Sequence, residues 1–306
     1  MTAAIEETPT PALVPEEHGE VALERVLWGC DFSEGSADAL RYVVPVARAY
    51  GSDVTALHVI PSTIPANGPV AALTNPDLLR PHLGHEVSIA LDRWLQPARD
   101  ASVPAHVALR GGNPVDEILG LAASLPADLL VVGRQARSLI ETGVLGSVTE
   151  GVLGRARCPV LVVPRGAVPP VGRLFGTILW ATDFSPHARL AQRYALSLAA
   201  RSGARLLLLH VVEGNLLTSE REAIREARLH LHQSLDAVRP VQCVPEPIVR
   251  VGNAPLEIAR LAAERSVDLV VMGVQGARTL HRLFCGSTAH RVVREVSCPI
   301  LAVRRV

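Results

Sequence analysis

The chain contains the same unit twice. Six short motifs follow one another in the same order in residues 26–163 and again in residues 178–303. The paired segments are VLWGCDFS and ILWATDFS, LHV and LHV, GN and GN, DLLVVG and DLVVMG, GS and GS, and CPVLVV and CPILAV. A shared order of motifs over this length indicates a repeated structural unit. Whatever fold one copy adopts, we expect the other to adopt as well.

The spacing between the copies locates an insertion and the domain boundaries. The first two motif pairs lie 152 residues apart and the last four lie 140 apart, so the first copy carries 12 extra residues. The turn-rich segment 61–76 accommodates them. Segment 166–173, GAVPPVGR, has the Pro and Gly content of a linker. We therefore expect a disordered acidic tail over 1–21, a first domain over 22–165, the linker, and a second domain over 174–306.

Aliphatic runs alternate with helical patterns in both copies, which predicts βαβ units and a parallel sheet. Helix starts are marked as well: Asn113 with Pro114 has the pattern of a cap followed by proline, and Ser147 with Glu150 has capping-box spacing. The fold class is therefore α/β. The expected strands are 25–30, 54–60, 105–110, 129–132 and 160–163 in the first copy, and 177–181, 205–212, 247–251, 269–272 and 300–304 in the second.

Composition argues against several classes of function. The formal net charge is zero, which argues against a broad nucleic-acid interface. No stretch approaches the roughly 18 apolar residues of a membrane-spanning helix. The five cysteines form no C-x-x-C pair and no secretory signal is visible, so we expect a cytoplasmic location. The first 20 residues hold five glutamates and no arginine, which is the basis for the disordered tail.

Segment 269–287 begins with an apolar run and continues with the pattern G-x2-G-x9-G-S. The pattern is formed by Gly273, Gly276, Gly286 and Ser287. Glycine permits positive φ and a close approach of backbone to a ligand. The amides that open the following helix favour an anion. The pattern is typical of a phosphate cradle, although a plain strand–loop–helix turn uses glycines in the same way. Lysine is absent from the sequence, which excludes a Walker A loop.

Taken together, these motifs resemble the universal stress protein family in its tandem form. The resemblance implies two tandem Rossmann-like (adenine-nucleotide α-hydrolase-like) domains, each with a five-stranded parallel sheet of order 3-2-1-4-5. Some members of that family bind ATP and others do not, and the glycine pattern separates them. Members commonly pair their last strands across a pseudo-two-fold axis, so we expect 160–163 and 300–303 to join in an intramolecular pseudo-dimer. A homodimer would then use other faces.

By the same resemblance, the second copy holds an ATP site. Asp183 corresponds to a carboxylate beside the ribose, and Ala181 and Val211 correspond to positions lining the adenine pocket. The positions implied at the end of the fourth strand and around the phosphates are Met272, Gly273, Gly276, Gly286, Ser287 and Thr288.

The first copy departs from the pattern at one place, where Ala136 replaces the second glycine. A left-handed backbone would cost alanine about 1 kcal/mol or more, and its Cβ would intrude on the phosphates. Arg134 and Arg137 could supply charge-assisted contacts instead, so ATP binding by this copy stays open. The positions that still match are Gly29, Asp31, Val59, Val132, Gly133, Gly146, Ser147 and Val148.

Other groups of polar residues are interpreted structurally. His58 and His210 end aliphatic strands and read as satisfied histidines rather than catalytic ones. Two His pairs, 82/85 and 230/232, are weak metal signals because no further ligand cluster accompanies them. Cys158 and Cys298 each precede a proline and a strand and read as core residues, and Cys285 reads as a buried thiol.

The sequence contains no recognisable catalytic constellation, so fast phosphoryl transfer is not expected. We expect a cytoplasmic, ATP-binding regulatory protein of the stress response, with Mg²⁺ on the nucleotide phosphates and an unknown protein partner. We expect neither a nucleic-acid nor a membrane partner. Two alternatives remain: a protein-interaction module without nucleotide, and a slow ATPase.

Overall fold

The computed structural model describes residues 21–61, 76–134, 145–214, 219–236, 245–274 and 287–304, with the side chains of 76–83, 235–236 and 287 left out. We refer to the half that contains residues 22–165 as the first repeat and to the half that contains residues 174–306 as the second. Val21, the last residue of the predicted tail, is buried against the first repeat's core.

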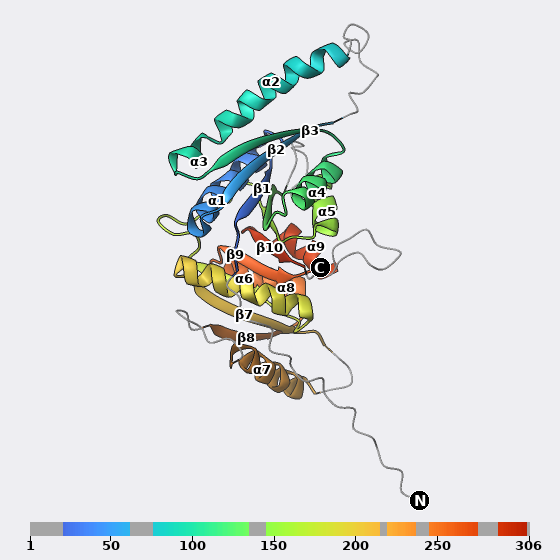
Figure 1. Cartoon of the computed structure of the whole chain (residues 1–306). Coiled ribbons are helices and arrows are strands. Elements are labelled where there is room, and N and C mark those ends of the chain that lie inside the picture. Colours follow the sequence, from blue (N-terminus) through green and yellow to red (C-terminus); the bar gives the residue numbers. More distant parts are fainter. Residues whose placement is uncertain are drawn as a thin grey trace, which may run out of the picture.

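Ten strands of the described residues form one continuous sheet, in the order β3-β2-β1-β4-β5-β10-β9-β6-β7-β8 (Figure 1). Within each repeat all neighbouring strands are parallel and follow the order 3-2-1-4-5, which confirms the expected fold. The bounds agree with the sequence-based expectation to within two residues. They are β1 Arg25–Gly29, β2 Asp53–Pro61, β3 Ala105–Gly112, β4 Leu129–Gly133, β5 Val160–Val163, β6 Thr177–Ala181, β7 Arg205–Val212, β8 Glu246–Val251, β9 Leu269–Gly273 and β10 Ile300–Val303.

Helices cover both faces of the sheet and enclose two aliphatic cores. One core lies between the sheet and α1, α2, α3, α6 and α7, and the other lies between the sheet and α4, α5, α8 and α9. Both cores run through the two repeats without a break. The helices are α1 Glu34–Tyr50, α2 Pro76–Trp94, α3 Gln96–Asp100, α4 Pro114–Ser124, α5 Ser147–Arg155, α6 Pro186–Ser202, α7 Glu220–Asp236, α8 Ala254–Glu264 and α9 Ser287–Glu295.

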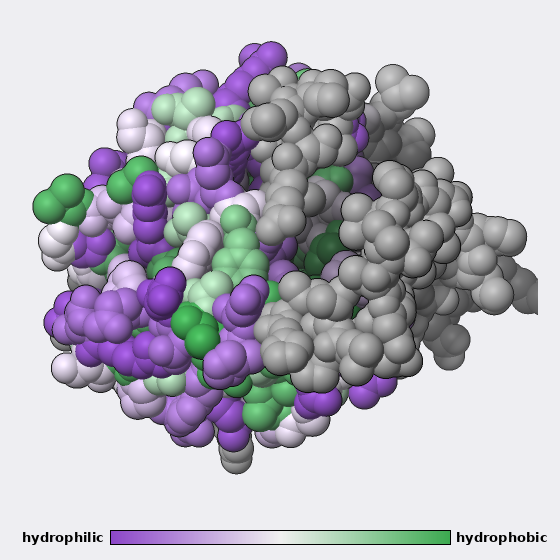
Figure 2. Space-filling view, turned by 90° about the horizontal axis from the view of Figure 1, so that it is seen from above, coloured by the Kyte–Doolittle hydropathy of each residue, from purple (hydrophilic) through white to green (hydrophobic). Residues whose placement is uncertain are grey.

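The outer surface at the first repeat's end of the molecule is mainly hydrophilic, with hydrophobic residues in small patches between polar ones (Figure 2). None of the helices described here is long and apolar enough to cross a membrane.

The aspartate that precedes the fourth strand of each repeat holds the start of the first strand. Asp128 Oδ2 accepts from the amide of Arg25 at 2.9 Å. Asp268 Oδ2 accepts from the amides of Gly176 and Thr177, each at 2.8 Å. The repeated Asp of the DLLVVG and DLVVMG motifs therefore fixes the central strand pair in place.

The last strands of the two repeats join the halves of the sheet. β5 and β10 are antiparallel, with Leu161 opposite Leu301 and both side chains buried. A parallel edge strand would otherwise expose a row of unpaired backbone groups. This pairing confirms the expected intramolecular pseudo-dimer.

The ends of helices α5 and α9 are held by arginines from the opposite repeat. Arg134, just after β4, donates to the carbonyls of Val296 at 2.6 Å and Val293 at 3.2 Å, at the end of α9. Arg304, just after β10, donates to Leu153 at 2.6 Å and to two further carbonyls at the end of α5. A cation at a helix C-terminus satisfies free carbonyls and opposes the dipole.

Candidate functional site

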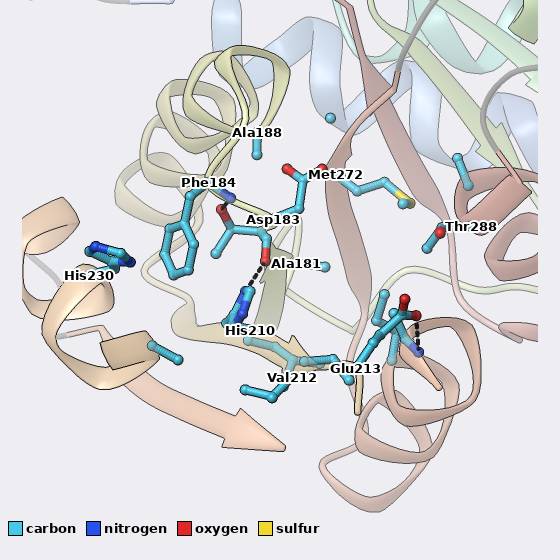
Figure 3. Close-up of a pocket in the computed structure, with 18 of the residues that line it drawn as sticks. Ala181, Asp183, Phe184, Ala188, His210, Val212, Glu213, His230, Met272 and Thr288 are labelled. Atoms are coloured by element: carbon cyan, nitrogen blue, oxygen red, sulfur yellow. Dashed lines mark hydrogen bonds between the residues drawn. The ribbon is translucent and has the colours of Figure 1, made fainter. Parts of the chain in front are cut away.

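A cavity of about 620 Å³ opens at the carboxyl ends of β6, β7 and β9 in the second repeat (Figure 3). It lies over the β6–β9 neighbour pair, where the strand order of this repeat reverses direction. Open α/β sheets bind ligands at this kind of position. The cavity brings together six of the residues predicted for the ATP site, namely Ala181, Asp183, Val211, Met272, Gly273 and Thr288.

Part of the predicted phosphate cradle lies outside the described residues. This applies to Gly276, Gly286 and Ala136, and to the side chain of Ser287, so their roles stay predictions. The structure does place the elements on either side of this loop. Strand β9 ends at Gly273, and α9 begins at Ser287 as expected. The N-terminus of α9 thus meets the cavity through Thr288 and Ala289.

The Asp-Phe-Ser motif makes a tight turn between the first strand and first helix of each repeat. Phe32 and Phe184 adopt left-handed backbone with φ of 61° and 60°, which is uncommon for a bulky residue and costs about 1–2 kcal/mol. The turn lets Asp183 Oδ1 accept from the Ser185 amide at 3.0 Å, while Ser185 caps α6. The motif therefore holds the aspartate at the rim of the cavity.

The histidine of each LHV motif fastens this turn to the second strand. His210 Nδ1 lies 2.9 Å from the carbonyl oxygen of Thr182, and His58 Nδ1 lies 2.8 Å from that of Cys30. The ring of His210 also packs on Phe184, with centroids 4.5 Å apart. The interpretation of these residues as satisfied structural histidines is supported by these bonds.

Glycine is required at the end of the fourth strand for a packing reason that the sequence did not reveal. A Cβ on Gly273 would lie 2.4 Å from the Ala188 amide nitrogen, and one on Gly133 would lie 2.7 Å from the backbone of Gly35. The strand end therefore passes directly against the first turn of α6 or α1. This close approach brings the helix N-terminus and the strand end to the same side of the cavity.

The cavity residues that the sequence did not assign to the nucleotide site include three titratable ones, Glu213, Glu226 and His230. Glu213 Oε1 accepts from the Ala254 amide at 3.2 Å and so caps α8 (Figure 3). His230, from α7, packs edge-on against Phe184 with centroids 5.2 Å apart. Helical spacing alone could not show that α7 turns these side chains toward the strand ends.

The described cavity lining is acidic rather than basic. It holds the carboxylates of Asp183, Glu213 and Glu226, and no arginine is among these lining residues. The favourable position for an anion is therefore at the start of α9, because Thr288 and Ala289 line the cavity there and a helix N-terminus favours negative charge. No group of three or more His, Cys, Asp or Glu residues in the described ranges could hold a metal ion, so the His230/His232 signal receives no support.

The first repeat places its predicted residues at the equivalent sheet edge, with one correction. Gly29, Val59, Val132 and Gly133 lie at the ends of β1, β2 and β4, and Gly146, Ser147 and Val148 lie at the start of α5. The expected capping box is wrong, because Gly146 is the N-cap of α5 and Glu150 Oε1 lies 3.1 Å from His290 Nε2 instead. Arg134, which the sequence offered as a charge-assisted contact for phosphate, donates its guanidinium to the end of α9.

Sequence and structure comparisons give one consistent result. A profile of the universal stress protein family matches residues 22–164 and 174–304. A universal stress protein of Methanocaldococcus jannaschii is 30% identical over 152 residues, which are 48% of this chain and 86% of that protein. One of Thermus aquaticus is 35% identical over 137 residues, 43% of this chain and 100% of that protein. A universal stress protein structure from Archaeoglobus fulgidus has a TM-score of 0.75 at 24% identity, covering 92% of this chain and 98% of that one.

Proposed function

The chain belongs to the universal stress protein family, with one family domain in each repeat, and from this premise we propose that it is an adenine-nucleotide-binding protein of the stress response. The nucleotide binds in the second repeat, and ATP is the form we expect. By composition we also assign it to the cytoplasm. Its domains would be 22–165 and 174–306, joined by 166–173.

The cavity above β6, β7 and β9 is the observation that supports this proposal. Its volume of about 620 Å³ falls within the range of roughly 300–1,000 Å³ found for small-molecule sites. It combines an apolar floor with a few polar groups at the rim, which suits a flat base attached to a polar sugar. Ala181, Val211, Ile258 and Met272 form the apolar part.

The polar groups divide between the sugar and the phosphates. The exposed Asp183 carboxylate can accept hydrogen bonds from ribose hydroxyls. Thr288 and the amides opening α9 can receive the phosphates, together with the 273–287 glycine loop. Mg²⁺ would be bound mainly by phosphate oxygens, because the described residues provide no metal site of their own.

The proposal is tested by the small molecules that the protein carries and by direct titration. Mass spectrometry of the supernatant after denaturation should detect adenine nucleotide. Calorimetric titration of the nucleotide-free protein with ATP should show binding that Gly286→Val weakens, because a β-branched side chain would block the cradle. Gly120→Ala is the control, since a Cβ there meets nothing within 4 Å.

The remaining outcomes separate the alternatives. A protein that releases no nucleotide and takes up no ATP would be a protein-interaction module. A protein that turns ATP over in a phosphate-release assay, with loss of activity in Gly286→Val, would be a slow ATPase. Equal ATP affinity of wild type and Gly286→Val would contradict the cradle.

A further inference from the structure

The two repeats differ at one buried position beside the cavity-edge aspartate. In the first repeat, Ser36 lies five residues after Asp31, and in the second repeat Ala188 lies five residues after Asp183. Both residues are in the first turn of the equivalent helices, α1 and α6, and both are buried. At equivalent backbone positions, the first repeat therefore has the hydroxyl of Ser36 and the second repeat has the methyl group of Ala188.

The Ser36 hydroxyl bonds to both the carboxylate and the backbone amide of Asp31. Its Oγ donates to Asp31 Oδ1 at 2.6 Å and accepts from the Asp31 amide at 3.1 Å. The same Oδ1 also accepts from the Ser33 amide at 3.0 Å. The carboxylate of the first repeat is therefore held by partners within its own turn.

Asp183 has no equivalent of the Ser36 hydrogen bonds. Its Oδ1 accepts from the Ser185 amide at 3.0 Å, as in the first repeat, but Ala188 offers no hydroxyl. Among the described residues, none bonds to Asp183 Oδ2 or to the Asp183 amide. The side chain of Asp183 is exposed and faces the cavity (Figure 3). Asp31 is only partly exposed.

We propose that Ser36 closes the first repeat to nucleotides and that Ala188 keeps the second open, so that the chain binds one nucleotide. This inference rests on the proposed function and concerns the sugar side of the same site. A ribose hydroxyl that bonds to Oδ1 in the first repeat would have to displace the Ser36 hydroxyl, because this oxygen already accepts from Ser36 Oγ and from the Ser33 amide. That exchange gains no hydrogen bond and leaves the proton of the buried Ser36 hydroxyl without its acceptor, which is unfavourable.

Two further differences act in the same direction. Thr149 Oγ1 donates to the Gly133 carbonyl at 2.7 Å at the start of α5, and the equivalent residue in α9 is Ala289. Arg134, the residue that follows Gly133 in the first glycine loop, is bonded to the end of α9. These two polar side chains of the first repeat are thus bonded within the protein.

The test is a calorimetric titration of the nucleotide-free full chain with ATP. The wild type should bind about one ATP per chain. Ala188→Ser should lower the affinity by about tenfold to a hundredfold, because the new hydroxyl takes up the Asp183 carboxylate. Ala200→Ser, on the exposed side of the same helix, should bind as the wild type does. Circular dichroism would confirm that each variant is folded.

A gain-of-function arm keeps the test independent of damage to the second site. In the Asp183→Ala background, which should abolish ATP binding, Ser36→Ala should restore measurable binding to the first repeat. Two equal sites in the wild type, an unaltered affinity of folded Ala188→Ser, or no binding by Ser36→Ala in that background would each overturn the inference. A wild type that binds no ATP would instead remove the proposed function on which it depends.

Discussion

Arg134 and Arg304 do the same work from opposite repeats, although they occupy different positions in the repeated unit. Each guanidinium donates to backbone carbonyls at the end of the other repeat's last helix, α9 for Arg134 and α5 for Arg304. Burial lowers the pKa of the Arg134 guanidinium from its ordinary value, so desolvating this charge has a cost that the carbonyl contacts must offset. The helices that follow the two glycine loops are therefore each anchored in the other repeat.

Removing these anchors should loosen the junction. Arg304→Gln leaves three carbonyl oxygens without their charged donor, and we expect the free energy of unfolding to fall by about 1–3 kcal/mol. Arg134→Gln should have a similar effect. Arg228→Gln, on the exposed face of α7, is the control and should change little. Urea unfolding measures all three, and equal midpoints throughout would show that the caps contribute nothing.

The pairing of β5 with β10 should also prevent separate chains from associating through these two strands. Leu161 and Leu301 are directly opposed and buried, so Leu301→Glu would place a carboxylate in an apolar interior and separate β5 from β10. The freed strand edges should then pair between chains and increase the mass measured by light scattering. Leu229→Glu, on the exposed surface of α7, should leave the mass unaltered. A Leu301→Glu variant with the wild-type mass would argue against this role of the edge.

Much of the fold could be predicted because its determinants are local and occur twice. Short aliphatic runs predicted the strand bounds to within two residues. Asn113 caps α4 as its pattern predicted, by accepting from the amides of Val115 and Asp116. The cavity-side positions of Asp183, Val211 and Met272 followed from matching three of the repeated motifs to a family. These features depend on a few neighbouring residues, which the sequence displays directly.

The features that could not be predicted depend on contacts between distant segments. Glu150 has capping-box spacing from Ser147, but it contacts His290, which occupies the equivalent position of the other repeat. Arg134 lies beside a glycine loop, yet its side chain turns toward α9. Glu213 and His230 reach the cavity only because of how α8 and α7 pack. No spacing rule within one segment reports such contacts.

The cysteines before the last strands should be unreactive in the folded protein. Burial raises the pKa of the Cys158 thiol to about 11 and that of Cys298 to about 12, because a thiolate is poorly solvated there. At pH 8 iodoacetamide should modify both much more slowly in the native protein than in urea, as peptide mass spectrometry would show. Since folding raises both pKa values, stability should be unaffected at neutral pH and should fall as the pH rises above about 9. Equal labelling rates in the native and unfolded protein would contradict the burial.

The glycine that ends β9 should be essential for a packing reason that is separate from any ligand. A Cβ at Gly273 would lie 2.4 Å from the Ala188 amide nitrogen and 2.5 Å from the His187 carbonyl carbon, both of them backbone atoms that cannot turn aside. Gly273→Ala should therefore push the strand end away from α6, lower the free energy of unfolding by about 1–3 kcal/mol and distort the cavity. For Gly120→Ala we expect the opposite change in stability. This residue is exposed within α4, where an added Cβ meets nothing within 4 Å, so alanine should stabilise the protein by about 0.5–1 kcal/mol. Thermal unfolding without nucleotide measures both changes, and a Gly273→Ala variant as stable as the wild type would refute the close approach of β9 and α6.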